Sequence, residues 1–334
     1  MKLAQFFKEI PNNKVHCYLC PRDCKIGEGQ TGFCFIRKNI GGKLYNLAYG
    51  KPYAVHIDPI EKKPLFHFLP GTDILSIGTA GCNLGCKFCQ NWDISKAKYD
   101  QDRAGEFMPE TAVQSAIRNN CSSIAYTYND PTIWAEYAMD IAKLARQNNL
   151  KNVMVTAGYI ALEVIPEVYE NMDAANIDLK AFTEEFYHKI TLSHLQPVLD
   201  AIKELKNLGI WIEITNLVIP TQNDDMQEIS DMCKWILDNL GNEIPIHFSA
   251  FHPDFKMTHL DRTPIKTLEK ARAVAQDCGL LHVYTGNVLG DGSNTYCPNC
   301  DELLIKRDWH AITENNLINK ECPGCGYQLK IIQE

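Results

Sequence analysis

The stretch that decides the fold is Gly81-Cys82-Asn83-Leu84-Gly85-Cys86-Lys87-Phe88-Cys89-Gln90-Asn91, which follows the strand-like run Ile74-Leu75-Ser76-Ile77-Gly78. Its three cysteines have C-x3-C-x2-C spacing. Three thiolates on one tight loop can hold three irons of a [4Fe–4S] cluster and leave the fourth iron without a protein ligand. Structural zinc is the rival interpretation, but zinc prefers four ligands and usually pairs C-x2-C knuckles. The spacing and the preceding strand therefore favour a cluster.

Length and composition limit the class of protein. The chain has 334 residues, which is enough for one large α/β domain with small appendages. No stretch approaches the roughly 20 apolar residues of a membrane span. Lys8 and Glu9 stand where a signal peptide would need an apolar core, so we expect a cytoplasmic protein without membrane contact. The net charge of −8 argues against a general nucleic-acid binder, which needs a basic surface.

Cysteine is unusually abundant, with fourteen residues, eleven of them in three local groups. Such groups indicate metal sites in a reducing compartment, whereas a disulfide framework is typical of small secreted chains. The N-terminal group is Cys17, Cys20, Cys24 and Cys34, in a segment with too few apolar residues to form its own core. Four thiolates suit zinc or a second iron–sulfur cluster equally well, and the x2, x3, x9 spacing matches neither the usual zinc ribbon nor the ferredoxin run.

The C-terminal group has a more specific pattern. Its two knuckles are separated by 21 residues, an arrangement typical of a tetrahedral four-cysteine site of the zinc-ribbon or rubredoxin kind. We predict zinc, with iron as the alternative, and a structural role, because so short a segment needs the metal to fold. The expected ligands are Cys297, Cys300, Cys322 and Cys325.

Short apolar runs alternate with helical patterns from residue 74 onward. Asp130-Pro131 predicts a helix start, and an amphipathic pattern after Gln196-Pro197 ends at Gly209. This alternation predicts a parallel sheet with right-handed crossovers and fits a partial (β/α)6-type barrel, whose chemistry gathers at the C-terminal ends of the strands. The expected strands are 74–78, 123–128, 153–156, 174–178, 211–218, 246–249 and 282–286.

Several polar residues stand at or near these strands. Asp178 and Lys180 follow a β-run and should share one side of the chain, either as a site or as an ordinary ion pair. Glu213, inside a strand, either points into a polar interior as a ligand or pairs with a neighbour. His67 lies between two aromatics, and packing is favoured over a role at the cluster. His247 and His252 flank an aromatic strand end and are active-site candidates.

The core from about 74 to 287 resembles radical SAM enzymes related to the activating enzymes of pyruvate formate-lyase and other glycyl-radical enzymes. Nearly the whole chain resembles the radical SAM enzymes of the AmmeMemoRadiSam system. Besides the three-cysteine loop and the final four-cysteine motif, the matching stretches are Glu61–Phe68, Tyr126–Thr132, Asn176–Lys180, His247–Pro253 and Tyr284–Val288.

The resemblance implies roles for individual residues. Cys82, Cys86 and Cys89 would ligate the [4Fe–4S] cluster, whose open iron would bind S-adenosylmethionine (SAM). Phe88 would lie near the adenine, and Lys180, in an Asp-x-Lys motif, would approach the SAM carboxylate. The cofactor-binding set implied in this way is Phe88, Asn129, Asp130, Asp178, Lys180 and Asn287, although this chain lacks the glycines that relatives carry at 128–131.

The resemblance also implies a domain plan and an activity. We expect an N-terminal cysteine-rich extension (1–70), a radical SAM partial barrel (71–293) and a zinc-ribbon-like module (294–334). The expected enzyme is an oxidoreductase that reductively cleaves SAM to a 5′-deoxyadenosyl radical and takes hydrogen from an unidentified small molecule or protein. A glycyl-radical enzyme activase is the alternative, and a zinc-ribbon nucleic-acid-binding protein is a remote one.

Partners follow from the same expectations. Low-potential reduction of the cluster calls for a flavodoxin- or ferredoxin-like reductant. Memo-like and AMMECR-like proteins, or a glycyl-radical enzyme, are the candidate partners, whereas nucleic acid is not expected.

Overall fold

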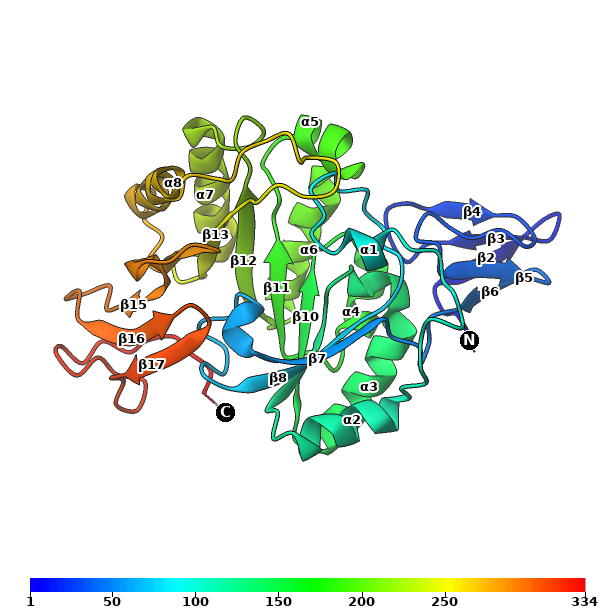
Figure 1. Ribbon diagram of the computed structural model, residues 1–334, viewed down its shortest axis with the longest axis horizontal. Helices are drawn as coiled ribbons and strands as arrows, with labels where there is room; N and C mark the ends of the chain where they lie inside the picture. The colour runs from blue at the N-terminus through cyan, green and yellow to red at the C-terminus, as the bar shows by residue number, and fades with distance from the viewer. Residues whose placement is uncertain (334) are drawn as a thin grey trace.

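The computed structural model describes residues 1–333 and is built on one eight-stranded sheet (Figure 1). Seven strands run parallel and lie side by side in chain order, and β7 pairs antiparallel with β8 at the edge. The strands are β7 (Ala54–Pro59), β8 (Asp73–Gly78), β9 (Ser123–Tyr126), β10 (Lys151–Thr156), β11 (Ala174–Asp178), β12 (Trp211–Val218), β13 (Ile246–Ala250) and β14 (Val283–Gly286).

All seven predicted strands are confirmed, and their ends agree with the prediction to within two residues. The strands keep the chain order, without the reversal that marks a doubly wound sheet. Within residues 1–333, the edge strands β7 and β14 are not paired with each other, so the sheet is open. The partial barrel stays a prediction, because the order of hydrogen-bonded strands does not measure the curvature of the sheet.

Helices connect the parallel strands and begin where the sequence offers caps. Asp130 caps η2 by accepting a hydrogen bond from the Thr132 N–H, and Asp225 caps α7 in the same way. The helices are α1 (Trp92–Ser95), α2 (Pro109–Arg118), η2 (Pro131–Trp134), α3 (Ala135–Gln147), η3 (Leu162–Val164), α4 (Ile165–Val168), α5 (Glu184–Phe186), η4 (Tyr187–Thr191), α6 (Leu195–Asn207), α7 (Met226–Leu240) and α8 (Ile265–Asp277), while η1 (Ile60–Lys62) and η5 (Asp291–Ser293) flank the sheet.

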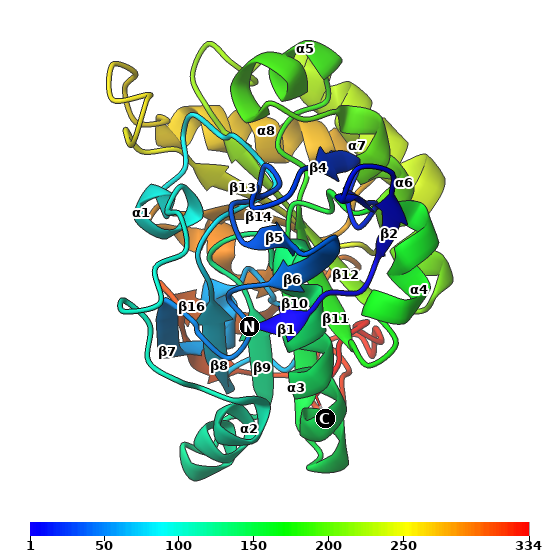
Figure 2. The same cartoon turned by 90° about the vertical axis from the view of Figure 1, so that its right-hand side faces the viewer.

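The N-terminal segment forms two small antiparallel sheets, and Figure 2 shows them facing the viewer beside α3 and α4. Arg37 attaches them to the main domain through a buried ion pair with Glu136 of α3, with Nη2 and Oε1 2.7 Å apart. The strand β7 lies within the predicted extension, yet it belongs to the main sheet. The six strands are β1 (Lys2–Leu3), β2 (Phe7–Ile10), β3 (Lys14–Cys17), β4 (Cys24–Ile26), β5 (Arg37–Ile40) and β6 (Lys43–Asn46).

The C-terminal module forms a three-stranded antiparallel sheet on the other side of the molecule (Figure 1). Its strands are β15 (Thr295–Tyr296), β16 (Leu303–Asp308) and β17 (Ala311–Asn315). Two of its cysteines belong to its small apolar core. Beyond the last strand of the module, Ile332 pairs with the segment around Phe68, so the module also contacts the main domain there.

The main core fills the space between the sheet and its helices. A second, smaller core is formed by residues of the 60–69 segment with Ile74, Ala125, Val153 and Ala174 of the sheet. The 60–69 segment therefore packs against β8–β11. Among the described residues, no helix is long and apolar enough to cross a bilayer.

Candidate active site

One cavity of about 440 Å³ lies at the C-terminal ends of the parallel strands. Six strands, β9 to β14, contribute residues at or just beyond their ends, and the three-cysteine loop follows the seventh, β8. The strand-end residues include Thr127, Thr156, Asp178, Leu217, Ser249 and Asn287. Cys82, Cys86 and Cys89 line the same cavity, so the topology gathers the predicted cluster ligands and the predicted SAM residues around one space.

The three-cysteine loop is fixed by close backbone packing. Gly81 has φ +80°, and a Cβ at this position would lie 2.0 Å from the Cys34 carbonyl oxygen. A Cβ on Gly85 would lie 2.5 Å from Leu192 Cδ1. The backbone N–H of Gly81 donates to the Ile94 carbonyl of α1 at 2.9 Å. The glycines are therefore required by close approach, and they let the cysteines turn into the cavity.

Asn129 and Asp130 support the walls of the cavity. The Asn129 side-chain amide donates to the Gly81 carbonyl at 2.7 Å, and its oxygen accepts from the Thr79 N–H at 3.1 Å. Asp130 Oδ2 accepts from Ala157 N–H at 2.9 Å, and burial raises the pKa of this carboxyl. Both side chains line the cavity, but their hydrogen bonds go to the backbone: Asn129 binds residues 79–81 at the start of the loop, and Asp130 binds Ala157 just after β10. Their predicted contact with SAM stays a prediction.

The thiols of the loop suit cluster ligands. Burial raises the pKa of Cys86 to about 12, against the opposing charge of Lys180. Burial and then Asp130 raise the pKa of Cys82, against Lys96. Buried thiols of this kind become thiolates when they bind a metal. Three thiols on one cavity wall, with two lysines nearby to balance negative charge, fit the donor set of a [4Fe–4S] cluster.

Asp178 and Lys180 lie on one side of the chain, as the alternation predicted. Lys180 Nζ lies 2.9 Å from Asp178 Oδ2 and 5.6 Å from the centre of the Phe88 ring. Burial alone would lower the pKa of Lys180, but the charges of Asp178 and Cys86 outweigh it and the pKa is raised. Lys180 is therefore a permanent cation at the cavity wall. Asn287, with φ +58°, directly follows the last strand and lines the same cavity.

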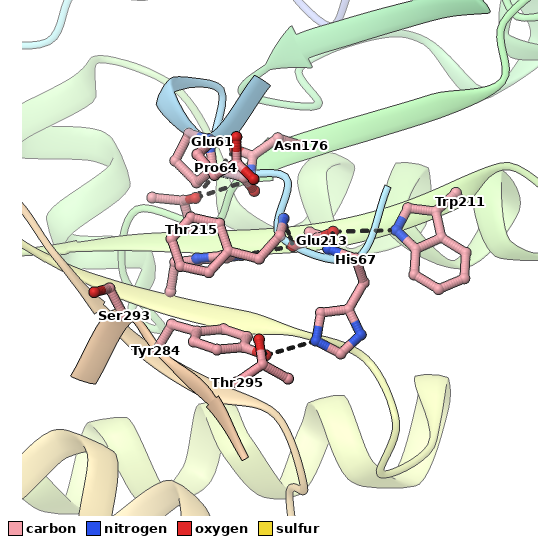
Figure 3. A network of polar contacts seen from close by, with 12 residues as sticks. Glu61, Pro64, His67, Asn176, Trp211, Glu213, Thr215, Tyr284, Ser293 and Thr295 are labelled. Carbon is pink, nitrogen blue, oxygen red and sulfur yellow. Dashed lines mark hydrogen bonds and ion pairs between the residues drawn. The ribbon is translucent and has the colours of Figure 1, made fainter. Parts of the chain in front are cut away.

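Glu213 pairs with its neighbours. Its carboxylate accepts from the backbone N–H groups of Phe66 and His67 at 2.9 and 2.8 Å, and it lies 2.8 Å from His247 Nε2. Figure 3 shows Glu213 with two of its neighbours, His67 and Trp211. These contacts agree with the interpretation that Glu213 pairs with its neighbours, and it does not line the cavity. His67 is also a packing residue, because its ring bonds the Lys330 carbonyl and the Tyr284 hydroxyl.

Of the two other candidate histidines, only His247 lines the cavity. Glu213 holds its Nε2, and its ring stacks on Tyr284 at 5.2 Å between centroids. His252 is exposed and bonds the adjacent Pro253 carbonyl, so it lies apart from the site.

A second wall of the cavity comes from segments outside the parallel strands. Glu61, Lys63 and Phe66 lie on one of them, and Trp309 and His310 come from the turn between β16 and β17. Arg307 stacks over the Phe66 ring with its guanidinium carbon 4.2 Å from the centroid, and its Nη2 donates to the Phe66 carbonyl. Sequence reasoning missed this wall, because nothing local relates residues more than 240 positions apart.

The C-terminal cysteines form a compact site. The four sulfurs of Cys297, Cys300, Cys322 and Cys325 all lie within 4.8 Å of one another, as one tetrahedral ion requires. The Asn299 side chain lowers the pKa of Cys325 to about 6, which favours its thiolate at neutral pH. A four-cysteine metal site is therefore supported by geometry, and zinc as the ion stays a prediction.

Comparisons with known proteins agree with this site. Residues 76–233 match the model of the Radical SAM superfamily. An uncharacterized protein of Methanocaldococcus jannaschii is 46% identical over 99% of this chain and 100% of its own length. The pyruvate formate-lyase-activating enzyme of Clostridium pasteurianum is 22% identical over 52% of this chain and 72% of its own. A radical SAM methyltransferase from Sphaerobacter thermophilus shares the fold, with a TM-score of 0.53, 12% identity and coverage of 66% and 68%.

The sheet, the three-cysteine loop and the family match thus define an α/β enzyme of the kind that pairs an iron–sulfur cluster with SAM. The chain belongs to the radical SAM superfamily, and its relatives include activating enzymes of glycyl-radical enzymes.

Proposed function

We propose that this protein reductively cleaves SAM and uses the resulting 5′-deoxyadenosyl radical to take a hydrogen atom from a substrate held in the cavity. The observation that carries the proposal is the meeting of Cys82, Cys86 and Cys89 with the ends of six parallel strands around one space. When bound, the cluster supplies the electron and SAM supplies the radical precursor. The protein's own residues must then bind, orient and shield them.

The side chains at the cavity divide this work. The three thiolates would hold the cluster, and Lys180 would pair with the SAM carboxylate, with Asp178 fixing its ammonium. Phe88, directly beside Lys180, offers an apolar face for the adenine. Asn129 keeps the loop in place through the Gly81 carbonyl. The walls keep bulk water from the reacting atoms, as a radical reaction requires.

We place the substrate against the second wall, beside Glu61, Lys63, Trp309 and His310. These residues offer both charges, an indole ring and an imidazole, so a polar small molecule or a polar protein segment would find partners there. The C-terminal module contributes part of this wall, and simple activating enzymes need not have such a module. We therefore favour a small molecule, or a protein other than a glycyl-radical enzyme, as the substrate. Memo-like and AMMECR-like proteins are the proposed partners in that case.

The glycyl-radical activase function is the second candidate. It is favoured by relatives named as activating enzymes, among them the 4-hydroxyphenylacetate decarboxylase activating enzyme of Clostridioides difficile, 24% identical over 50% of this chain. In either case a flavodoxin- or ferredoxin-like protein would supply the low-potential electron. We propose a cytoplasmic location, because none of the fourteen cysteines forms a disulfide and a reducing compartment keeps thiols available for metal sites.

The proposal is tested by anaerobic reconstitution followed by SAM and dithionite, with 5′-deoxyadenosine measured by chromatography. The wild-type chain should form 5′-deoxyadenosine, and Cys86→Ala should form none. Cys278→Ala is the matched control, because this cysteine lies at the end of α8, outside the cavity, and should leave the product unchanged. An intact cluster that yields no 5′-deoxyadenosine contradicts the proposed function. A glycyl-radical signal on a co-expressed partner would select the activase.

A further inference from the structure

A second hollow lined by cysteines lies in the N-terminal module, apart from the cavity. Cys17 of β3 and Cys24 of β4 are directly paired across the two strands, and Cys20 lies in the turn between them. Cys34 precedes β5 and is buried, as is Cys17. The four cysteines line one hollow, together with the apolar side chains of Leu19, Ile26, Phe33 and Ile133.

Two arginines also line this hollow: the buried Glu136 balances the charge of Arg37, whereas Arg22 supplies positive charge that Glu136 does not balance. Arg37 is 2% exposed, and its guanidinium is held by Glu136. Arg22 lies over the Phe33 ring at 3.8 Å and donates from Nε to the Asn83 carbonyl at 2.8 Å. Cations beside buried thiols offset the negative charge that a centre with four thiolates would carry. The hollow is therefore built for an anionic group.

The distances between the cysteine sulfurs distinguish a zinc site from a cluster site. One zinc ion with Zn–S bonds of about 2.3 Å brings its four sulfurs to about 3.8 Å from one another. Within residues 1–333, only the C-terminal cysteines form a group with all ligand atoms within 4.8 Å, and two of their S–S distances are 3.6 Å. No three of the four N-terminal sulfurs meet this limit.

The three-cysteine loop provides an internal standard. Cys82, Cys86 and Cys89 line one cavity, yet their sulfurs also fail to lie within 4.8 Å of one another. Ligands to different irons of one cluster are farther apart than ligands to a single ion, so wide spacing is what a cluster site requires. The N-terminal group, like the cluster loop, is wider than a one-ion site, whereas the C-terminal group has the spacing of a one-ion site.

We propose that Cys17, Cys20, Cys24 and Cys34 hold a second iron–sulfur cluster, with four protein ligands, in place of the zinc ion that their number alone also allows. Four cysteines leave no iron open, so this cluster does not bind SAM. Its position is next to the first site: the Cys34 carbonyl lies against Gly81, and Arg22 bonds Asn83 of the cluster loop. The second cluster thus orders the module on which the loop rests.

The test uses the full chain with Cys82→Ala, Cys86→Ala and Cys89→Ala, purified without oxygen and analysed for iron, zinc and acid-labile sulfide. We expect retained iron and sulfide in equal amounts, about two or four of each per chain. Adding Cys17→Ala and Cys34→Ala should remove both. Zinc at two ions per chain, or iron without sulfide, overturns the proposal, because sulfide-free iron belongs to a rubredoxin-like C-terminal site.

A second measurement uses the wild-type chain, so it tests the proposal even if the alanine variants do not fold. In the reduced wild-type chain, electron paramagnetic resonance should show two cluster signals, of which SAM changes only one. Cys17→Ser should lose the signal that SAM leaves unchanged and keep the other. A wild-type spectrum with only the SAM-sensitive signal, and about four irons per chain, overturns the second cluster. These readouts do not require SAM cleavage, so they fail separately from the proposed function.

Discussion

Lys180 shows how one residue is prepared for a charged ligand. Its side chain is 13% exposed and its Nζ is held by Asp178 at 2.9 Å, and Cys86 would be a second negative neighbour as a cluster-bound thiolate. These partners keep it charged despite its burial, because removing its proton would leave their negative charge uncompensated. Asp178 is 37% exposed, so the pair can take up a ligand carboxylate without full desolvation. A lysine in this state binds an anion at any physiological pH.

We predict that Lys180→Gln weakens SAM binding about tenfold or more, because a charged hydrogen bond contributes roughly 1.5–3 kcal/mol. The iron content should not change, since the three cysteines are untouched. The dissociation constant can be measured by titrating SAM into the reconstituted protein. Lys189→Gln is the matched control: its ion pair with Glu185 is exposed and outside the cavity, so SAM affinity should stay constant. Equal affinities in the two variants would remove Lys180 from the SAM site.

At the scale of the element, the three-cysteine loop depends on what lies behind it. Gly81 lies against the carbonyl of Cys34, and the Asn129 side chain donates a hydrogen bond to the carbonyl of Gly81. The loop is therefore fixed by the N-terminal module and by the segment after β9. A loop so fixed presents its thiols in one geometry before any cluster is present. Because the loop is already ordered, less conformational entropy is lost when the cysteines bind a cluster.

Gly81→Ala should therefore destabilise the chain by roughly 3 kcal/mol or more and lower its iron content, since the new Cβ meets backbone that cannot easily move. Gly29→Ala is the matched control: Gly29 also has positive φ (+74°), but nothing lies within 4 Å of a Cβ there. It should cost only about 1 kcal/mol and keep its iron. Denaturant unfolding and iron analysis measure both effects. Similar losses in the two variants would show that φ alone, and not the contact with Cys34, matters.

Local patterns predicted most of these elements and part of the site. The strand β11 and the pair Asp178 and Lys180 could be read from neighbouring residues, because alternation fixes the side on which they lie. The second wall could not, because Arg307 meets Phe66 only after the whole sheet has formed. The metal of the N-terminal cysteine group also stayed open in sequence, because spacing along the chain does not give distances between sulfurs.

At the scale of the whole molecule, the main domain and the C-terminal module share a buried polar seam. His67 bonds the Lys330 carbonyl, and its ring lies 4.5 Å from that of His282, which is 2% exposed. Burial lowers the pKa of His282 to about 4 and also lowers that of His67, and the positive charge of Arg307 acts on His67 in the same direction. The folded chain therefore keeps both rings neutral at mildly acidic pH.

This seam should make stability depend on pH between about 6.5 and 4. In that range the unfolded chain binds a proton at His282 that the folded chain does not, so the free energy of unfolding falls as pH falls, by up to about 1.4 kcal/mol per pH unit for this residue. His282→Phe should remove this contribution. The difference between wild type and variant, from denaturant midpoints, should be constant above pH 7 and shift by about 3 kcal/mol by pH 4. A constant difference down to pH 4 contradicts the buried neutral state.

The contact of the C-terminal module with the 66–69 segment also affects the order of events during synthesis. Ile332 bonds His67 and Leu69 through its backbone, and Arg307 bonds Phe66, so the second wall is complete only when these residues, which are made after the three-cysteine loop, have folded. A nascent chain folds from its N-terminal end, so the three-cysteine loop leaves the ribosome long before this wall exists. We therefore expect a cluster to be delivered to the loop before the C-terminal module folds and completes the cavity.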